Sequence, residues 1–402
     1  STMYGEFRAG YQRLFVDRHD INITLVGSLR DETNTEVTTI QQSLPKRNIS
    51  TAARLAYGYD SKYFIEGNFG YNGSERFDKK HRYGFFPSIG AGWMVTNESF
   101  MKGVEKALTS LKLKATYGLV GNDQIGRLED RFFYLSQVNL RDANRGYYFG
   151  QELNYYQNGI SLIRYANDLI TWEKAKKMNI GIEMTLFKDL TINADYFTER
   201  RSNILLTRTD IPTTLGLVTT PQHNVGVGKG VGAETELKYQ KYFNKDLQLI
   251  INGNFTYASS EYLKYEEPDF SDIPWRSRIG QKISQPFGYI AERHFIDEEE
   301  VKNSPKQTFG EYGAGDIKYK DISGDGQINS DDQVPIGLPT TPEINYGIGF
   351  TLKYKCLDFS CFFQGEARTS FMIAPQKIQP FVNNDLTPRG QSGLLEAIAN
   401  DY

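Results

Sequence analysis

The sequence predicts an all-β fold, an antiparallel β-barrel that crosses a membrane with its strands. Apolar and polar residues alternate along several segments, which is the period of a strand whose two faces meet different media. These segments exceed the about 5 to 6 residues of an ordinary strand. They match the about 9 to 11 residues with which a tilted strand crosses a bilayer.

The alternation is clearest in segment 178–187, and it recurs in 111–120, 190–199 and 231–240. In the first of these, one set of alternate positions is apolar throughout: Met178, Ile180, Ile182, Met184 and Leu186. The intervening positions are mostly polar or small: Asn179, Gly181, Glu183, Thr185 and Phe187. Each of these segments therefore favours a strand with one lipid-facing and one lumen-facing side.

Short and long links alternate between the expected strands, which places all long links on one side of the membrane. We expect twelve strands, at 4–16, 21–31, 48–59, 62–72, 83–95, 111–120, 176–187, 190–201, 229–240, 247–260, 343–354 and 357–366. We expect the long outer loops at about 121–175, 202–228, 261–342 and 367–402. The one longer inner link, 96–110, reads as a short helix opened by Asn97.

Composition excludes other classes of protein. The formal charge of the 402 residues is −3, so a nucleic-acid partner, which needs a basic face, is not expected. No run approaches the roughly 18 to 20 apolar residues of a spanning helix. Cys356 and Cys361 are an odd number of positions apart, so on one strand they face opposite sides and form no disulfide.

The ends of the chain suggest a portion of a larger protein. No secretory signal opens the sequence at Ser1, no plug domain precedes the first strand, and 393–402 does not read as a closing strand. An open sheet would leave two edges bare in lipid. We therefore expect 1–402 to be the C-terminal portion of a larger barrel whose other strands lie outside this chain.

The order of several motifs resembles one family. The motifs are KYFIEGNFGYNGSERF, FFPSIGAGW and ESFM within 47–101, LKLKATYGLVGNDQI at 111–125, WEKAKKMNIGIEMTLFKDLTINADYF at 172–197, NVGVGKGVGAETEL at 224–237 and GDIKYKDISGDGQINSDDQVPIG at 315–337. Together they resemble the barrel of SusC/RagA-type TonB-linked outer-membrane proteins, TonB-dependent transporters. The resemblance covers nearly the whole chain.

The resemblance implies a barrel of about 22 strands with an N-terminal plug. It implies TonB-dependent import of an oligosaccharide or a peptide through the outer membrane of a Gram-negative, Bacteroidetes-type bacterium. A SusD-like surface lipoprotein and TonB are the implied protein partners. A siderophore or cobalamin receptor of the same barrel class is an alternative, and a secreted, soluble, β-rich glycan-binding protein is another.

The sharpest chemical motif lies in 321–332 and resembles the calcium loop of EF-hands and dockerins. Its positions one, three, five, seven and twelve hold Asp321, Ser323, Asp325, Gln327 (through its carbonyl) and Asp332, and Gly326 stands at the sharp turn. We expect a structural Ca²⁺ here. An acidic turn without a metal is the alternative.

No enzyme is expected. The four histidines, His19, His81, His223 and His294, are scattered, and the glycines 226, 228, 230 and 232 read as small residues on one face of a strand. The polar positions Glu183, Asn193, Asp195, Glu234 and Glu236 follow from regular alternation, not from a catalytic pair. Ligand contacts are expected in 130–165, where nine aromatic residues could either stack on sugars or peptides or pack the loop: Phe132, Phe133, Tyr134, Tyr147, Tyr148, Phe149, Tyr155, Tyr156 and Tyr165.

Overall fold

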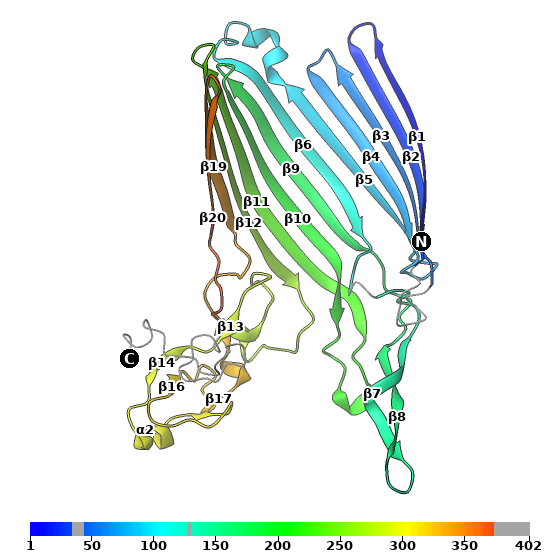
Figure 1. Ribbon diagram of the computed structural model, residues 1–402, viewed down its shortest axis with the longest axis vertical. Coiled ribbons are helices and arrows are strands. Elements are labelled where there is room, and N and C mark those ends of the chain that lie inside the picture. Colours follow the sequence, from blue (N-terminus) through cyan, green and yellow to red (C-terminus); the bar gives the residue numbers. More distant parts are fainter. Residues whose placement is uncertain (34–43, 127–129, 374–402) are drawn as a thin grey trace.

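The computed structural model describes residues 1–33, 44–126 and 130–373. Its main feature is one curved antiparallel sheet of twelve long strands (Figure 1). These strands are β1 (Thr2–Phe15), β2 (His19–Glu32), β3 (Lys46–Tyr59), β4 (Tyr63–Ser74), β5 (Tyr83–Met94), β6 (Leu108–Asn122), β9 (Glu173–Leu186), β10 (Leu190–Thr207), β11 (Gln222–Tyr242), β12 (Leu247–Lys264), β19 (Ile344–Tyr354) and β20 (Leu357–Ala367). All twelve predicted strands are confirmed.

Each long strand pairs with the next one along the chain, so the sheet is a meander. The β6 strand pairs directly with β9, because the chain between them leaves the sheet to form a separate hairpin, β7 (Gln137–Phe149) and β8 (Tyr155–Arg164). In the described part of the chain, β1 pairs only with β2 and β20 only with β19. The sheet is therefore open at both edges.

Short links lie at one end of the sheet and long links at the other (Figure 1). The predicted alternation is thus confirmed, but the outer links are shorter than predicted. They run over 123–172, 208–221 and 265–343 because β6, β9, β10, β11 and β12 extend past the expected bounds at this end of the sheet. The β11 strand has 21 residues, or about 70 Å at about 3.3 Å per residue. The last predicted loop, 367–402, lies mostly outside the described residues.

The predicted helix in 96–110 is wrong. Two 3₁₀ turns, Val95–Asn97 and Ser99–Met101, stand there instead, followed by turns. Asn97 caps no helix, since its side-chain amide donates to the carbonyl of Ser61 at 2.7 Å. Gly103 has a φ of +103°, a conformation that does not continue a helix.

The two faces of the sheet differ as the alternation predicts. Ile180 and Ile182 of β9 pair across the sheet with Ala115 and Leu113 of β6 on one face, which we call the apolar face. Near the short turns this face carries aromatic residues: His19, Tyr57, Tyr59, Tyr63 and Trp93. Aromatic belts of this kind mark the interfaces of membrane barrels.

A cluster of buried hydrophobic residues lies at the outer end of the sheet, where loops close over the strand ends. It comprises Phe77, Phe86, Ile125, Phe133, Ile170 and Trp172. The ring centroids of Trp172 and Phe86 are 5.2 Å apart, edge to face, and the indole Nε1 of Trp172 donates to the carbonyl of Arg82. This small core fixes the outer loops on the sheet.

The link between β12 and β19 folds into a compact unit of its own, which we call the outer unit (Figure 1). It contains β13 (Phe287–Gly288), β14 (Ala291–His294), α2 (Glu298–Asn303), β15 (Lys306–Gln307), β16 (Ile317–Tyr319), β17 (Gln327–Ile328) and β18 (Val334–Pro335), with the 3₁₀ turns Pro274–Arg276 and Ser330–Asp332. A further 3₁₀ turn, Thr213–Leu215, lies between β10 and β11. None of the described helices is long and apolar enough to cross a membrane.

Candidate functional site: the polar face and the outer loops

The centre of the polar face carries an ion-pair network across β6, β9 and β10. The ammonium of Lys114 lies 3.2 Å from the Glu183 carboxylate and 3.1 Å from that of Asp195. Lys112 reaches the other oxygen of Glu183 at 3.4 Å. Gly181 lies beneath this network, where the side chains of Asp195 and Lys114 occupy the space that a Cβ would need.

The network continues into a polar hollow along β11 and β12. Glu234 and Glu236 line it from β11, and Asn252, Asn254 and Thr256 line it from β12. Such a wall suits a water-filled path for polar solutes. Because Glu183 and Asp195 are both paired with lysines, they do not form the free acid and base of a glycosidase.

The alternating glycines of β11 lie on this polar face, as expected of small residues at a crowded wall. A Cβ at Gly232 would overlap the ring of Phe197, and one at Gly226 would press on Ile204 and Leu206. The glycines therefore let neighbouring strands and side chains approach closely. They have no phosphate-binding context, because a strand and not a helix surrounds them.

The nine loop aromatics separate into two groups. Phe132 and Phe133 are buried, Phe133 completely, so for these two the packing interpretation is correct. Tyr134 and Tyr165 are half-buried. The remaining five are exposed around the tip of the β7–β8 hairpin, with Tyr147 at 70% and Tyr155 at 61%: Tyr147, Tyr148, Phe149, Tyr155 and Tyr156.

Two arginines hold Phe133 at the base of this hairpin. The guanidinium carbon of Arg164 lies 4.8 Å from the ring centroid, and that of Arg76 lies 6.0 Å away. Arg164 donates to the carboxylate of Asp130 at 2.8 Å, and Arg76 donates to the Asp130 carbonyl at 2.6 Å. Burial lowers the pKa of both arginines, although the charge of Asp130 opposes the shift. The base of the hairpin is thus rigidly anchored.

The tip carries its aromatic side chains in contacting pairs. The rings of Tyr148 and Tyr156 lie 4.8 Å apart and those of Tyr147 and Phe149 lie 5.6 Å apart. In Figure 1 the hairpin projects away from the sheet beyond its outer end. Exposed aromatic faces of this kind serve as contact surfaces for a sugar, a peptide or a protein partner.

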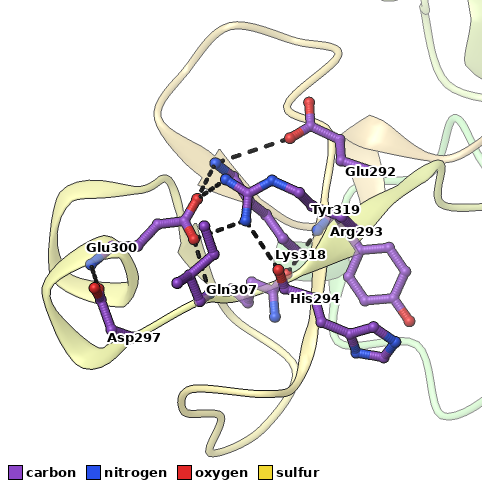
Figure 2. Close-up of polar contacts among 9 residues, drawn as sticks. Glu292, Arg293, His294, Asp297, Glu300, Gln307, Lys318 and Tyr319 are labelled. Carbon is purple, nitrogen blue, oxygen red and sulfur yellow. Dashed lines mark hydrogen bonds and ion pairs between the residues drawn. The ribbon is translucent and has the colours of Figure 1, made fainter. Parts of the chain in front are cut away.

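The outer unit is held by a network around Glu300, shown in Figure 2. The Glu300 carboxylate accepts hydrogen bonds from the guanidinium of Arg293 and, at 3.1 Å, from the ammonium of Lys318. The backbone N–H of Glu300 donates to the carboxylate of Asp297, the N-cap of α2, at 2.8 Å. The bonds from Arg293, the Ile296 amide and Lys318 lower the pKa of Glu300 to about 2. The network joins α2 to β14 and β16.

The predicted calcium residues all lie in one loop of the outer unit, where their carboxylates accept hydrogen bonds from backbone N–H groups of the same loop. The side chain of Asp332 is fully buried and accepts from the backbone N–H of Ile322, Ser323 and Asn329, each at 2.9 Å. These bonds lower its pKa, although burial of the charge opposes the shift. Asp321 accepts from the N–H groups of Gly324 and Gly326.

Asp325 accepts from the backbone N–H of Gln327 at 2.8 Å, so the sharp turn is also held by the loop itself. Across residues 1–33, 44–126 and 130–373, no three acidic, histidine or cysteine side chains form a cluster that could hold a metal ion. Ca²⁺ at Asp321, Ser323, Asp325, Gln327 and Asp332 stays a prediction from the sequence.

Histidines and cysteines have structural surroundings. His19 bonds to the hydroxyl of Tyr57 and His294 to the carbonyl of Gly315, each at 2.8 Å. Cys356 lies in the turn between β19 and β20 and Cys361 lies in β20, and both are free thiols, as predicted.

These features define a class: a transmembrane, antiparallel β-barrel with short turns at one end and large loops at the other. The comparison with protein families agrees, since residues 4–369 match the model of the TonB dependent receptor-like β-barrel. The chain belongs to this family, whose members are outer-membrane proteins of Gram-negative bacteria. Its apolar face is therefore the lipid-facing side, and its polar face lines the lumen.

Several curated relatives are TonB-dependent receptors. Receptor P26 of Formosa agariphila is 30% identical over 81% of this chain and 33% of its own length. The receptor SusC of Bacteroides thetaiotaomicron is 27% identical over 78% of this chain and 30% of its own length. The chain thus spans about a third of these relatives. They are receptors, not enzymes, which agrees with the prediction of no catalytic activity.

Among solved structures, the chain is similar in fold to the RagAB peptide importer in its 'closed-closed' state. The TM-score is 0.69 at 20% identity, over 96% of this chain and 43% of that chain. The 'open-open' state of the same importer gives the same TM-score at 95% and 42% coverage. The similarity to SusC and to RagAB confirms the resemblance drawn from the motifs.

Proposed function

We propose that this chain supplies part of the barrel of a TonB-dependent importer that takes up an oligosaccharide or peptide nutrient. The observation that carries this proposal is the polar lumen wall centred on Lys114, Glu183 and Asp195, backed by an apolar outer face. Charged side chains are unfavourable against hydrocarbon, so a charged face on a lipid-embedded sheet is stable only where water and polar solutes contact it.

The barrel is completed by strands outside this chain. An open sheet with unpaired backbone groups at β1 and β20 is not stable in hydrocarbon. An N-terminal plug inside the completed barrel and TonB, which transmits energy to it, are the other elements of this proposal. Family membership supports both.

The relatives support the kind of nutrient. SusC and the RagAB peptide importer are the named proteins to which the chain is similar. We propose the same type of cargo here, an oligosaccharide or a peptide, and a surface lipoprotein of the SusD type as the second component. A Bacteroidetes-type bacterium is the proposed source, since the chain is similar to SusC of Bacteroides thetaiotaomicron.

The exposed aromatic tip around Tyr147 and Tyr155 supports a contact with ligand or lipoprotein. It is anchored through Arg164 and Phe133 but covered by nothing in the described chain. Ordering five large aromatic side chains at a solvent-exposed tip without a partner would be unfavourable for a secreted protein.

The test is to tag the full-length parent protein, extract it from outer membranes with detergent, and identify what copurifies by mass spectrometry. A stoichiometric surface lipoprotein together with bound oligosaccharide or peptide would support the proposal and distinguish the two cargo classes. A protein released in buffer without detergent and without a partner would refute it in favour of the soluble glycan-binding alternative.

A further inference from the structure

A hollow of about 480 Å³ lies where the outer ends of β10 and β12 meet the outer unit. We call it the rim pocket. It is lined by Leu205 of β10, by Tyr265, Phe270, Arg276 and Arg278 of the segment after β12, and by Phe287 of β13. The volume falls within the range of about 300 to 1,000 Å³ that is usual for small-molecule sites.

Arg278 is placed in this pocket by two aromatic rings. Its guanidinium carbon lies 5.3 Å from the ring centroid of Phe287 and 5.9 Å from that of Tyr265. The guanidinium forms no hydrogen bond or ion pair with the residues that the structure describes. Aromatic contacts leave the N–H groups at the edge of a guanidinium available, so this edge can serve a ligand.

Arg276 lines the same pocket, and only some of its guanidinium N–H groups have hydrogen-bond acceptors among the described residues. Its guanidinium lies 5.7 Å from the ring centroid of Phe270 and donates to the side-chain carbonyl of Gln333 at 2.8 Å. The Nε of Arg276 is buried and has no hydrogen-bond partner among the described residues. A buried donor without an acceptor is unfavourable, and an acceptor entering the pocket would relieve that cost.

The acidic side chains of the pocket are engaged elsewhere. Glu267 accepts from the hydroxyl of Ser277 and from the backbone N–H of Arg278, so it holds the loop that carries the arginines. Glu266 lies 3.5 Å from the Nε of Arg208. The two carboxylates therefore do not neutralise Arg276 and Arg278 by direct pairing.

We propose that the rim pocket binds a carboxylate group of the imported nutrient through Arg278 and Arg276. The guanidinium groups of the two arginines lie over the aromatic rings of the pocket and place cationic N–H donors in its wall. A planar guanidinium recognises a carboxylate by two parallel hydrogen bonds. A uronic-acid oligosaccharide and an acidic peptide both carry this group, and the inference rests on the proposed import function.

The experiment measures binding to the purified full-length parent protein in detergent by isothermal titration calorimetry. The probes are trigalacturonate with maltotriose as its neutral counterpart, and triglutamate with triglutamine. We expect at least one acidic probe to bind ten times more tightly than its neutral counterpart. The acidic probe that binds identifies the source of the carboxylate.

Variants then locate the site. Arg278→Gln should weaken the acidic probe at least tenfold, and Arg278→Lys should restore only part of the affinity, because an ammonium cannot form the paired bonds. Lys302→Gln removes one positive charge from the exposed surface of the same outer unit and should leave binding unchanged.

Two results would overturn the inference: acidic probes that bind no better than neutral ones, or a tightly bound acidic probe that Arg278→Gln leaves unaffected. Both results can be told apart from a failure of the import proposal. If the import proposal fails, the parent protein copurifies with no lipoprotein and no nutrient. The calorimetric comparison of wild type with the Arg278 variants still measures whether the rim pocket binds a carboxylate.

Discussion

The guanidinium of Arg164 donates to the carboxylate of Asp130 across 2.8 Å, and only 8% and 11% of these side chains are exposed. The pair joins the end of β8 to the segment that precedes the hairpin, directly beside the buried ring of Phe133. It therefore sets the direction in which the aromatic tip leaves the barrel.

Arg164→Gln should loosen the β7–β8 hairpin without unfolding the barrel. The change removes the arginine that pairs with the buried Asp130 carboxylate, and breaking a buried pair costs about 3 kcal/mol. Amide exchange measured by mass spectrometry should become about a hundredfold faster in 137–164 only. Arg145→Gln, at the exposed tip, is the matched control. Equal exchange in both variants would contradict a structural role for the pair.

Acid should loosen the outer unit through Glu300. Its folded-state pKa of about 2 lies below the ordinary value of 4.5, so the stabilising effect is complete above pH 4.5 and disappears as the pH falls towards 2. Exchange in 291–319 should therefore rise through this window in the wild type. Glu300→Gln should abolish the pH dependence that comes from this group, while Glu299→Gln, on the exposed side of α2, should keep it.

The calcium motif can be tested on Asp332. Asp332→Ala removes the buried acceptor of three half-buried N–H groups and should destabilise the outer unit by about 2 to 3 kcal/mol. If Ca²⁺ binds this loop, as the sequence predicts, the melting temperature should be higher in millimolar calcium than in EGTA, and Asp332→Asn should abolish the difference. Equal melting temperatures of the wild type in calcium and in EGTA would refute the predicted metal.

The orientation of the sheet can be tested with one pair of neighbours on β9. Ile180 lies on the lipid-facing side near the middle of the strand, and Asn179 lies on the lumen side. Ile180→Lys should cost about 2 to 4 kcal/mol and reduce assembled protein in the outer membrane, whereas Asn179→Lys should assemble normally. Heat-modifiable migration on gels measures the assembled fraction. The reverse ranking would mean that the faces are assigned wrongly.

The strands could be predicted from the sequence because one face of each strand meets lipid and the other meets the aqueous lumen. Apolar and polar residues therefore alternate along the strand. Segment 178–187 contains Ile180 and Glu183 on opposite faces, and a shift of one residue would reverse both. The extra length of β10 to β12 carries no such signal. Beyond the bilayer both faces of these strands meet water or loops, so the polar and apolar contrast that marked 190–201 fades by Thr207.

The sites in the outer loops were less predictable. The sequence singled out the aromatics of 130–165, but not that Phe133 would lie between Arg76 and Arg164, since Arg76 comes from a link far away in the chain. Arg276 and Arg278 belong to no sequence motif that would have indicated a binding site. Their pocket arises only when the segment after β12 folds against β10 and β13, and a composition signal cannot report on such a contact.

The aromatic tip gives the last prediction. Tyr147→Ser combined with Tyr155→Ser removes the two most exposed tyrosines of the hairpin tip while leaving its anchor at Phe133 intact. If the tip contacts the proposed lipoprotein, the double variant should reduce the amount that copurifies at least tenfold, because aromatic anchors dominate protein interfaces. Phe187→Ser combined with Phe243→Ser, at exposed positions in the short turns at the other end of the sheet, is the matched control for lost aromatic area. An undiminished lipoprotein with reduced nutrient uptake would assign the tip to the ligand, and a double variant equal to wild type in both would leave it without a binding role.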